Sequence, residues 1–195
     1  MVNLIGISGS LRQGSFNTAL LRAAKAAVPD EAALEVMTLH GIPLYDGDLE
    51  KRDGVPPVVK ELKSAIVAAD GLLLATPEYN NGIPGVFKNG IDWLSRPPSD
   101  IQLVFGGKTV AVMGASPGRF GTALAQSAWL PVLRTLGTIP WFGGRLALSQ
   151  ANNTFDESGA IKDPAMQEQL RHFLRGFVDF VKRTPKPLSG AHQNN

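Results

Sequence analysis

The chain contains no cysteine among its 195 residues. It therefore has no disulfide framework, no thiolate metal site and no cysteine nucleophile. Charge is also sparse, because only 18% of the residues are Asp, Glu, Lys or Arg, and the formal net charge is +2. No basic cluster or basic helix face stands out, so we expect no nucleic-acid partner and no membrane partner.

Long apolar runs are missing as well. No run approaches the roughly 20 residues that span a bilayer, and a strand begins at the N-terminus without a charged leader. A cytoplasmic protein is the expectation. His40, His172 and His192 are scattered along the chain, so we expect no metal site.

The apolar content of 44% is enough for one well-filled domain, which we place at residues 1–183. Residues 184–195 hold two prolines and a polar end, which is typical of a disordered tail. Residues 40–57 are expected to form a long connection. Elsewhere, apolar patterns predict strands and helices in alternation. The strands are expected at 2–7, 34–39, 71–76, 109–114 and 139–142, with 146–149 as an extension of the last, and the helices at 16–28, 59–69, 84–94, 122–136 and 164–182. This alternation predicts an α/β fold with an open parallel sheet and helices on both faces.

The first strand stops in a polar, glycine-broken loop at residues 9–15 that opens a helix. Ser10, Ser15 and Asn17 are short donors, and Arg12 carries a fork of donors that matches phosphate oxygens. The helix that follows directs unpaired N–H groups and its positive dipole end at the same place. The loop therefore predicts a phosphate cradle. The alternative is a surface turn whose Ser and Arg side chains simply cap the helix.

The loop also narrows the choice of anion. Ser15 stands where the lysine of a Walker loop would be, which disfavours ATP and GTP. The dinucleotide pattern G-x-G-x-x-G is absent, and the second strand ends in His40 rather than in an acid that would hold a ribose. A single terminal phosphate fits better than a pyrophosphate.

Two further loops follow the third and fourth strands, at residues 77–82 and 115–121. In an open parallel sheet all three loops meet at the carboxyl ends of the strands. Backbone groups of residues 77–80 can read the edge of a planar ligand that Tyr79 flanks, and residues 115–121 supply N–H groups at its other edge. A planar heterocycle with one phosphate is FMN. Taken singly, these loops could also be a turn with an exposed tyrosine and a Pro-Gly turn.

Three segments carry a family resemblance: Gly-Ser-Leu-Arg-x-x-Ser-x-Asn at 9–17, Thr-Pro-Glu-Tyr-Asn at 76–80 and Lys-Asn-Gly-Ile-Asp-Trp-Leu at 88–94. They resemble the NADPH-dependent FMN reductase family of flavodoxin-like quinone, azo-dye and chromate reductases. The resemblance implies a five-stranded parallel sheet in the order 2-1-3-4-5. It implies FMN contacts in the first two loops from Ser10, Arg12, Ser15, Phe16, Asn17, Pro77, Glu78, Tyr79 and Asn80.

In the third loop we expect FMN contacts from Ser116, Pro117, Gly118 and Arg119. The segment Arg119-Phe120-Gly121 departs from the Gly-Gly pair that is common in the family. Three roles stay open for Arg119, namely stabilising reduced flavin, contacting the NADPH 2′-phosphate, or plain solvent exposure.

The implied activity is a two-electron, ping-pong transfer of hydride from NADPH or NADH through FMN to quinones, azo compounds, chromate or free flavin. No side chain is expected to act as a catalytic group, because the flavin carries the chemistry. The resemblance also implies a homodimer or homotetramer. The alternatives are a flavodoxin-like electron carrier and a flavin-binding regulatory protein.

Overall fold

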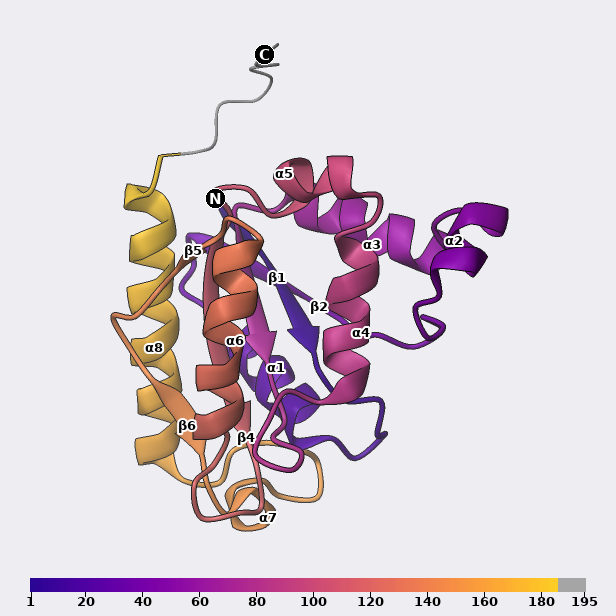
Figure 1. Cartoon of the computed structure of the whole chain (residues 1–195). Helices are drawn as coiled ribbons and strands as arrows, with labels where there is room; N and C mark the ends of the chain where they lie inside the picture. Colours follow the sequence, from indigo (N-terminus) through magenta and orange to yellow (C-terminus); the bar gives the residue numbers. More distant parts are fainter. Residues whose placement is uncertain (186–195) are drawn as a thin grey trace.

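The computed structural model describes residues 1–185, in which parallel strands alternate with helices (Figure 1). The strands pair in the order β2-β1-β3-β4-β5, and β6 also pairs with β4. This confirms the predicted sheet order. The strands are β1 (Val2–Ser8), β2 (Ala32–Met37), β3 (Gly71–Ala75), β4 (Thr109–Ala115), β5 (Ile139–Pro140) and β6 (Leu146–Leu148).

Helices cover both faces of this sheet, as the alternation predicts (Figure 1). Helices α1 and α8 pack on one face, where Leu4 and Leu73 lie among their apolar side chains. Helices α3, α4 and α6 pack on the other, over Ile5 and Leu72. Neighbouring strand residues thus face opposite layers, because successive side chains of a strand alternate in direction. The bounds are α1 (Phe16–Ala27), α3 (Pro57–Ala68), α4 (Gly85–Leu94), α6 (Ala123–Thr135) and α8 (Pro164–Arg183).

Residues 40–57 form the expected long connection between β2 and α3, but it contains a short helix that the sequence did not predict. Helix α2 (Gly47–Asp53) lies within it, with the Asp46 side chain accepting a hydrogen bond from the Asp48 N–H at its start. Acidic residues in its first turn and Lys51 and Arg52 in its last complement the helix dipole. Three short elements were also missed, namely η1 (Pro98–Asp100), α5 (Ile101–Val104) and α7 (Ala151–Thr154).

The fifth strand is shorter than the predicted 139–142. β5 pairs only with Thr109 and Val110 of β4, and β6 pairs with Met113 to Ala115 farther along the same edge. Two short strands therefore share the fifth position of the sheet. Pro140 ends the first of them, as expected for an edge strand, because proline has no N–H to donate.

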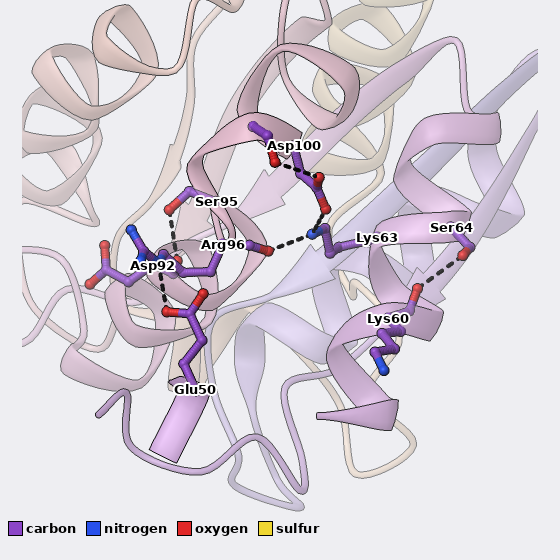
Figure 2. Close-up of polar contacts among 9 residues, drawn as sticks. Glu50, Lys60, Lys63, Ser64, Asp92, Ser95, Arg96 and Asp100 are labelled. Atoms are coloured by element: carbon purple, nitrogen blue, oxygen red, sulfur yellow. Dashed lines mark hydrogen bonds and ion pairs between the residues drawn. The ribbon is translucent and has the colours of Figure 1, made fainter. Parts of the chain in front are cut away.

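A polar cluster ties α2 to α3, α4 and η1 (Figure 2). The Arg96 Nε donates to the Glu50 carboxylate over 2.8 Å, and this hydrogen bond lowers the pKa of Glu50. The buried Lys63 donates to the Arg96 carbonyl and pairs with Asp100. This cluster fixes the chain beyond α4. Most of the predicted tail, residues 186–195, lies outside the described residues.

Candidate functional site

The three predicted loops follow β1, β3 and β4, which are neighbours in the sheet. Their starts are in direct contact, since the Gly9 N–H donates to the Ala75 carbonyl and the Thr76 N–H to the Met113 carbonyl, both over 2.9 Å. A Cβ on Gly114 would lie 2.2 Å from the Thr76 carbonyl oxygen, so only glycine permits this approach. The structure therefore brings the three loops to one edge of the sheet.

Loop 9–15 ends in a capped helix start. The Ser15 Oγ accepts from the Thr18 N–H over 3.3 Å, as an N-cap residue does. Within residues 1–185, no hydrogen bond uses the backbone N–H of Phe16 or Asn17, which are the first two of α1. Ser15 can therefore cap the helix while loop 9–15 also serves as a phosphate cradle, because the cap uses only the Thr18 N–H and leaves the N–H groups of Phe16 and Asn17 free for a ligand.

The Asn17 side chain is not free for a phosphate. Its Nδ2 donates to the Ala115 carbonyl and its Oδ1 accepts from the Ala115 N–H, each over 2.9 Å. Asn17 is 3% exposed, and the pair joins residues 98 positions apart. Its side chain therefore clamps α1 to the end of β4, and only its backbone N–H remains for a ligand.

Arg12 is an exposed cation beside these N–H groups. Its Nη2 donates to the Gly14 carbonyl over 2.7 Å, and its guanidinium lies 5.9 Å from the centroid of the Phe16 ring. Its backbone N–H donates to the buried Ser10 Oγ over 3.3 Å. In the described part of the chain Arg12 forms no ion pair, so its charge is available to an anion.

The Phe16 ring packs against a second aromatic side chain. The ring stacks on Phe155 with centroids 5.9 Å apart and an interplanar angle of 14°. Phe155 follows α7 and is buried. The aromatic pair therefore anchors the start of α1 to the segment after β6.

Loop 77–82 is a tight hydrogen-bonded turn. The Tyr79 N–H donates to the Gly82 carbonyl and the Gly82 N–H to the Tyr79 carbonyl, over 3.2 and 3.0 Å. Asn80 and Asn81 both have left-handed backbone, with φ of 50° and 62°, which asparagine tolerates best after glycine. Pro77 is buried, and its carbonyl accepts from the Thr76 hydroxyl. The turn leaves the Tyr79 ring 48% exposed beside the strand ends.

Glu78 has a structural role that the sequence did not indicate. Its Oε2 accepts from the Leu124 and Ala125 N–H groups, each over 2.9 Å. A carboxylate at this position caps the N-terminus of α6 and offsets its positive dipole end. Glu78 therefore occupies two of the N–H groups at this helix start.

Loop 115–121 is also braced from within. Ser116 donates its N–H to the Leu148 carbonyl and accepts at Oγ from the Gly118 N–H, over 2.9 and 3.2 Å. Pro117 has no N–H, and Arg119 is exposed with no ion pair in residues 1–185. Gly118 and Arg119 are two of the predicted FMN contacts in this loop. The Gly118 N–H already donates to the Ser116 hydroxyl, whereas the Arg119 N–H has no hydrogen-bond partner in residues 1–185.

His40 was not predicted to contact any of the three loops. It follows β2, whose neighbour in the sheet is β1, so it borders loop 9–15. Its Nε2 lies 3.1 Å from the Leu11 carbonyl oxygen and its Nδ1 3.0 Å from the Thr38 Oγ1. The strand order could have revealed this contact, because it places the end of the second strand beside the first loop.

The strand-end loops present an exposed surface. Hollows of about 390 and 250 Å³ lie elsewhere, between α1 and α8 and between α6 and residues 140–145. Across residues 1–185 no cluster of three His, Asp or Glu side chains could hold a metal ion. None of the helices in that range has the length and apolar character that crossing a membrane requires.

Fold and loops together define a doubly wound parallel sheet with three strand-end loops gathered at its switch point. The model of the NADPH-dependent FMN reductase family matches residues 2–153, and the chain belongs to that family. An NAD(P)H-dependent FMN reductase of Pseudomonas aeruginosa is 43% identical over 182 residues, which cover 93% of this chain and 96% of that protein. A 2-hydroxy-1,4-benzoquinone reductase of a Burkholderia species is 37% identical, with 89% of this chain and 90% of that protein covered.

A solved structure has the same fold over nearly its whole length. The flavoenzyme NAD(P)H:(acceptor) oxidoreductase FerB of Paracoccus denitrificans superposes with a TM-score of 0.84 at 30% identity. The match covers 94% of this chain and 99% of that one. The family assignment identifies the chain as an oxidoreductase.

Proposed function

We propose that the chain binds FMN across the three strand-end loops and transfers electrons from NADPH or NADH to small acceptors. The observation that carries this proposal is the start of α1. There the unused N–H groups of Phe16 and Asn17 lie beside Arg12, whose charge has no acidic partner in residues 1–185. Such a helix start binds phosphate through its N–H groups and its dipole.

The other proposed contacts with FMN come from the hydroxyl groups of the first loop and the backbone of the other two loops. Ser10 and Ser15 line the cradle. Their hydroxyl oxygens already accept hydrogen bonds from the backbone N–H groups of Arg12 and Thr18, so they hold the loop in shape as well as facing the ligand. Residues 77–80 and 116–119 provide backbone groups along two sides of the ring site, and Tyr79 lies beside it. FMN fits this arrangement because it combines one terminal phosphate with a planar ring.

When bound, FMN supplies the hydride chemistry. The residues of this chain supply orientation and leave the site open to solvent, and the Glu78 carboxylate is engaged with α6 rather than free as an acid or base. Because the loops form an open surface, donor and acceptor can use the same face in turn. Ping-pong kinetics are the consequence.

The name of the Burkholderia relative, a 2-hydroxy-1,4-benzoquinone reductase, supports quinones as the acceptor class. A benzoquinone is small and planar, so it can lie over an exposed ring held by loops 77–82 and 115–121. Azo compounds, chromate and free flavin are further candidate acceptors, and a cytoplasmic location is part of the same proposal.

Self-association into a homodimer or homotetramer is also proposed. Trp93 and Trp129 are fully buried and belong to the core, so they do not form an interface. Leu130 and Phe142, at 43% and 73% exposed, border the hollow beside α6 instead. Light scattering at micromolar concentration is expected to give a mass of two or four chains, and a monomer mass would contradict this.

The test of the function is a flavin analysis followed by steady-state kinetics. The purified protein should release FMN on denaturation and oxidise NADPH or NADH in the presence of a benzoquinone. Plots of initial rate with both substrates varied should give parallel lines. Release of FAD, or failure to bind flavin after reconstitution, would overturn the proposal. Bound FMN without turnover would favour an electron carrier.

A further inference from the structure

His40 joins the end of β2 to the phosphate-side loop. Its two ring nitrogens lie 3.1 Å from the Leu11 carbonyl oxygen and 3.0 Å from the Thr38 hydroxyl. The first contact links residues 29 positions apart. A single side chain thus connects a strand end to the middle of loop 9–15.

The two hydrogen-bond partners of His40 determine which ring nitrogen carries the proton. A carbonyl oxygen only accepts, so the Nε2 of His40 must carry the proton and donate to Leu11. In the neutral ring the Nδ1 then accepts from the Thr38 hydroxyl. Both nitrogens are satisfied in one tautomer, and the ring is held in one orientation.

The bonded carbonyl belongs to the peptide that precedes Arg12. Because a peptide group is planar, holding the Leu11 carbonyl toward His40 also sets the direction of the Arg12 N–H, which points to the Ser10 Oγ. The same peptide sets where the Arg12 side chain leaves the backbone. The Arg12 guanidinium then reaches the Gly14 carbonyl within the loop.

We propose that His40 is a positioning residue that holds the Leu11–Arg12 peptide in the orientation in which loop 9–15 receives a phosphate dianion. The inference rests on the proposed function, since it concerns the phosphate end of the FMN site. It adds a residue from outside the three loops, on the neighbouring strand. Without this hydrogen bond the peptide can rotate, and the loop must be ordered again when the anion binds.

The experiment compares two ligands that share the ring and differ in the phosphate. Dissociation constants of FMN and riboflavin are measured for the flavin-free wild-type protein and for His40→Ala, His40→Gln and the control His172→Ala. His172 is an exposed histidine on α8, so its removal tests for a general effect of losing imidazole. Glutamine keeps an N–H donor at similar reach.

His40→Ala should weaken FMN binding about tenfold, the effect of one hydrogen bond, and leave riboflavin binding unchanged. His40→Gln should restore most of the FMN affinity, and His172→Ala should resemble wild type. Equal losses for both flavins, or no loss for FMN, would overturn the role of His40 while leaving the proposed function intact. A wild-type protein that binds neither flavin would overturn the proposed function and this role with it.

Discussion

The amino ends and the carboxyl ends of the parallel strands lie at opposite sides of the sheet, which we call the amino edge and the carboxyl edge. The two use polar residues in different ways. At the amino edge, Lys182 pairs with Glu31 over 2.8 Å and Lys63 pairs with Asp100. At the carboxyl edge, Arg12 and Arg119 have no ion pair in residues 1–185. Ion pairs thus join neighbouring elements at the amino edge, whereas two cations at the carboxyl edge have no acidic partner in residues 1–185.

Two further polar residues at the carboxyl edge, Asn17 and Glu78, add to this comparison. Asn17 and Glu78 occur in the motifs that suggest ligand contacts, yet their side chains bond to backbone of other segments. Asn17 joins α1 to the end of β4, and Glu78 occupies two N–H groups at the start of α6. These two side chains therefore brace the loops, whereas the backbone N–H groups of Phe16 and Asn17 stay unpaired in residues 1–185.

The largest effect is expected where the carboxyl edge is most tightly packed. Gly114→Ala would place a Cβ 2.2 Å from the Thr76 carbonyl oxygen, so loops 77–82 and 115–121 must separate. We expect the free energy of unfolding to fall by about 3 kcal/mol, together with loss of FMN binding.

Urea unfolding and flavin titration measure both effects. The control is Gly85→Ala at the start of α4, where an added Cβ has no neighbour within 4 Å and should not destabilise the protein. A Gly114→Ala protein with unchanged stability would show that the two loops do not need this close approach.

Arg12→Ala tests whether the unpaired cation of the carboxyl edge serves the ligand. FMN binding should weaken by about 1.5 to 3 kcal/mol, the range for a hydrogen bond to a charged group. Riboflavin affinity should stay the same. Arg22→Ala, an exposed arginine farther along α1, is the control. A loss that is equal for FMN and riboflavin would place Arg12 away from the phosphate.

Lys63→Met tests the ion pair between Lys63 and Asp100 at the amino edge. Removing this buried amine leaves the Arg96 carbonyl and Asp100 without their partner (Figure 2). The free energy of unfolding should fall by about 2 kcal/mol, with no change in FMN affinity. Lys60→Met, on the same helix but exposed, is the matched control for chemical denaturation. A weakened FMN affinity in Lys63→Met would break the separation between the two edges.

Glu78→Gln tests the carboxylate that caps α6. The amide oxygen can still accept from the helix N–H groups, but the negative charge near the ring site is lost. Reduction adds negative charge to flavin, so its midpoint potential should rise by roughly 10 to 20 mV, which is about 0.5 to 1 kcal/mol for two electrons. Glu31→Gln, at the amino edge, should not change the potential in a redox titration. A fall in potential would contradict the electrostatic role.

The smallest effect concerns pH and Glu50. Hydrogen bonding from Arg96, and secondarily from Tyr45, lowers the pKa of Glu50, so its ionised form stabilises the folded state. This contribution is present above the ordinary glutamate pKa of about 4.3 and is lost as the pH falls through the lowered value. The stability difference between wild type and Glu50→Gln should therefore shrink from pH 7 to pH 3 in urea titrations. A stability difference that grows as the pH falls would contradict the claim that ionised Glu50 stabilises the folded state.

The fold was largely predictable because apolar periodicity and strand-helix alternation are local signals. Buried runs such as Gly71–Ala75 and the capped start of α1 at Ser15 could be recognised directly. Helix α2 was missed because its residues are polar and none is buried, so it has no apolar stripe. The split between β5 and β6 depends on pairing with β4, which no local pattern records.

The meeting of the three loops was predictable, whereas the hydrogen-bond partners of their side chains were not. Loop position follows from strand order, which the motifs implied. The Asn17 clamp and the Glu78 cap join residues 98 and 46 positions apart, so they exist only once the strands are assembled. A sequence motif shows that a residue is at the site, whereas its hydrogen-bond partners decide whether it holds the ligand or the loop.

The most direct test of this account is an NMR titration of the isotope-labelled, flavin-free protein with FMN. The backbone N–H resonances of Phe16 and Asn17 should shift strongly, because these groups gain a phosphate acceptor. The Asn17 side-chain amide should stay nearly unchanged, because it remains bonded to the Ala115 carbonyl. A large shift of that side-chain amide, with the Phe16 and Asn17 backbone unmoved, would contradict the claim that backbone binds while side chains brace.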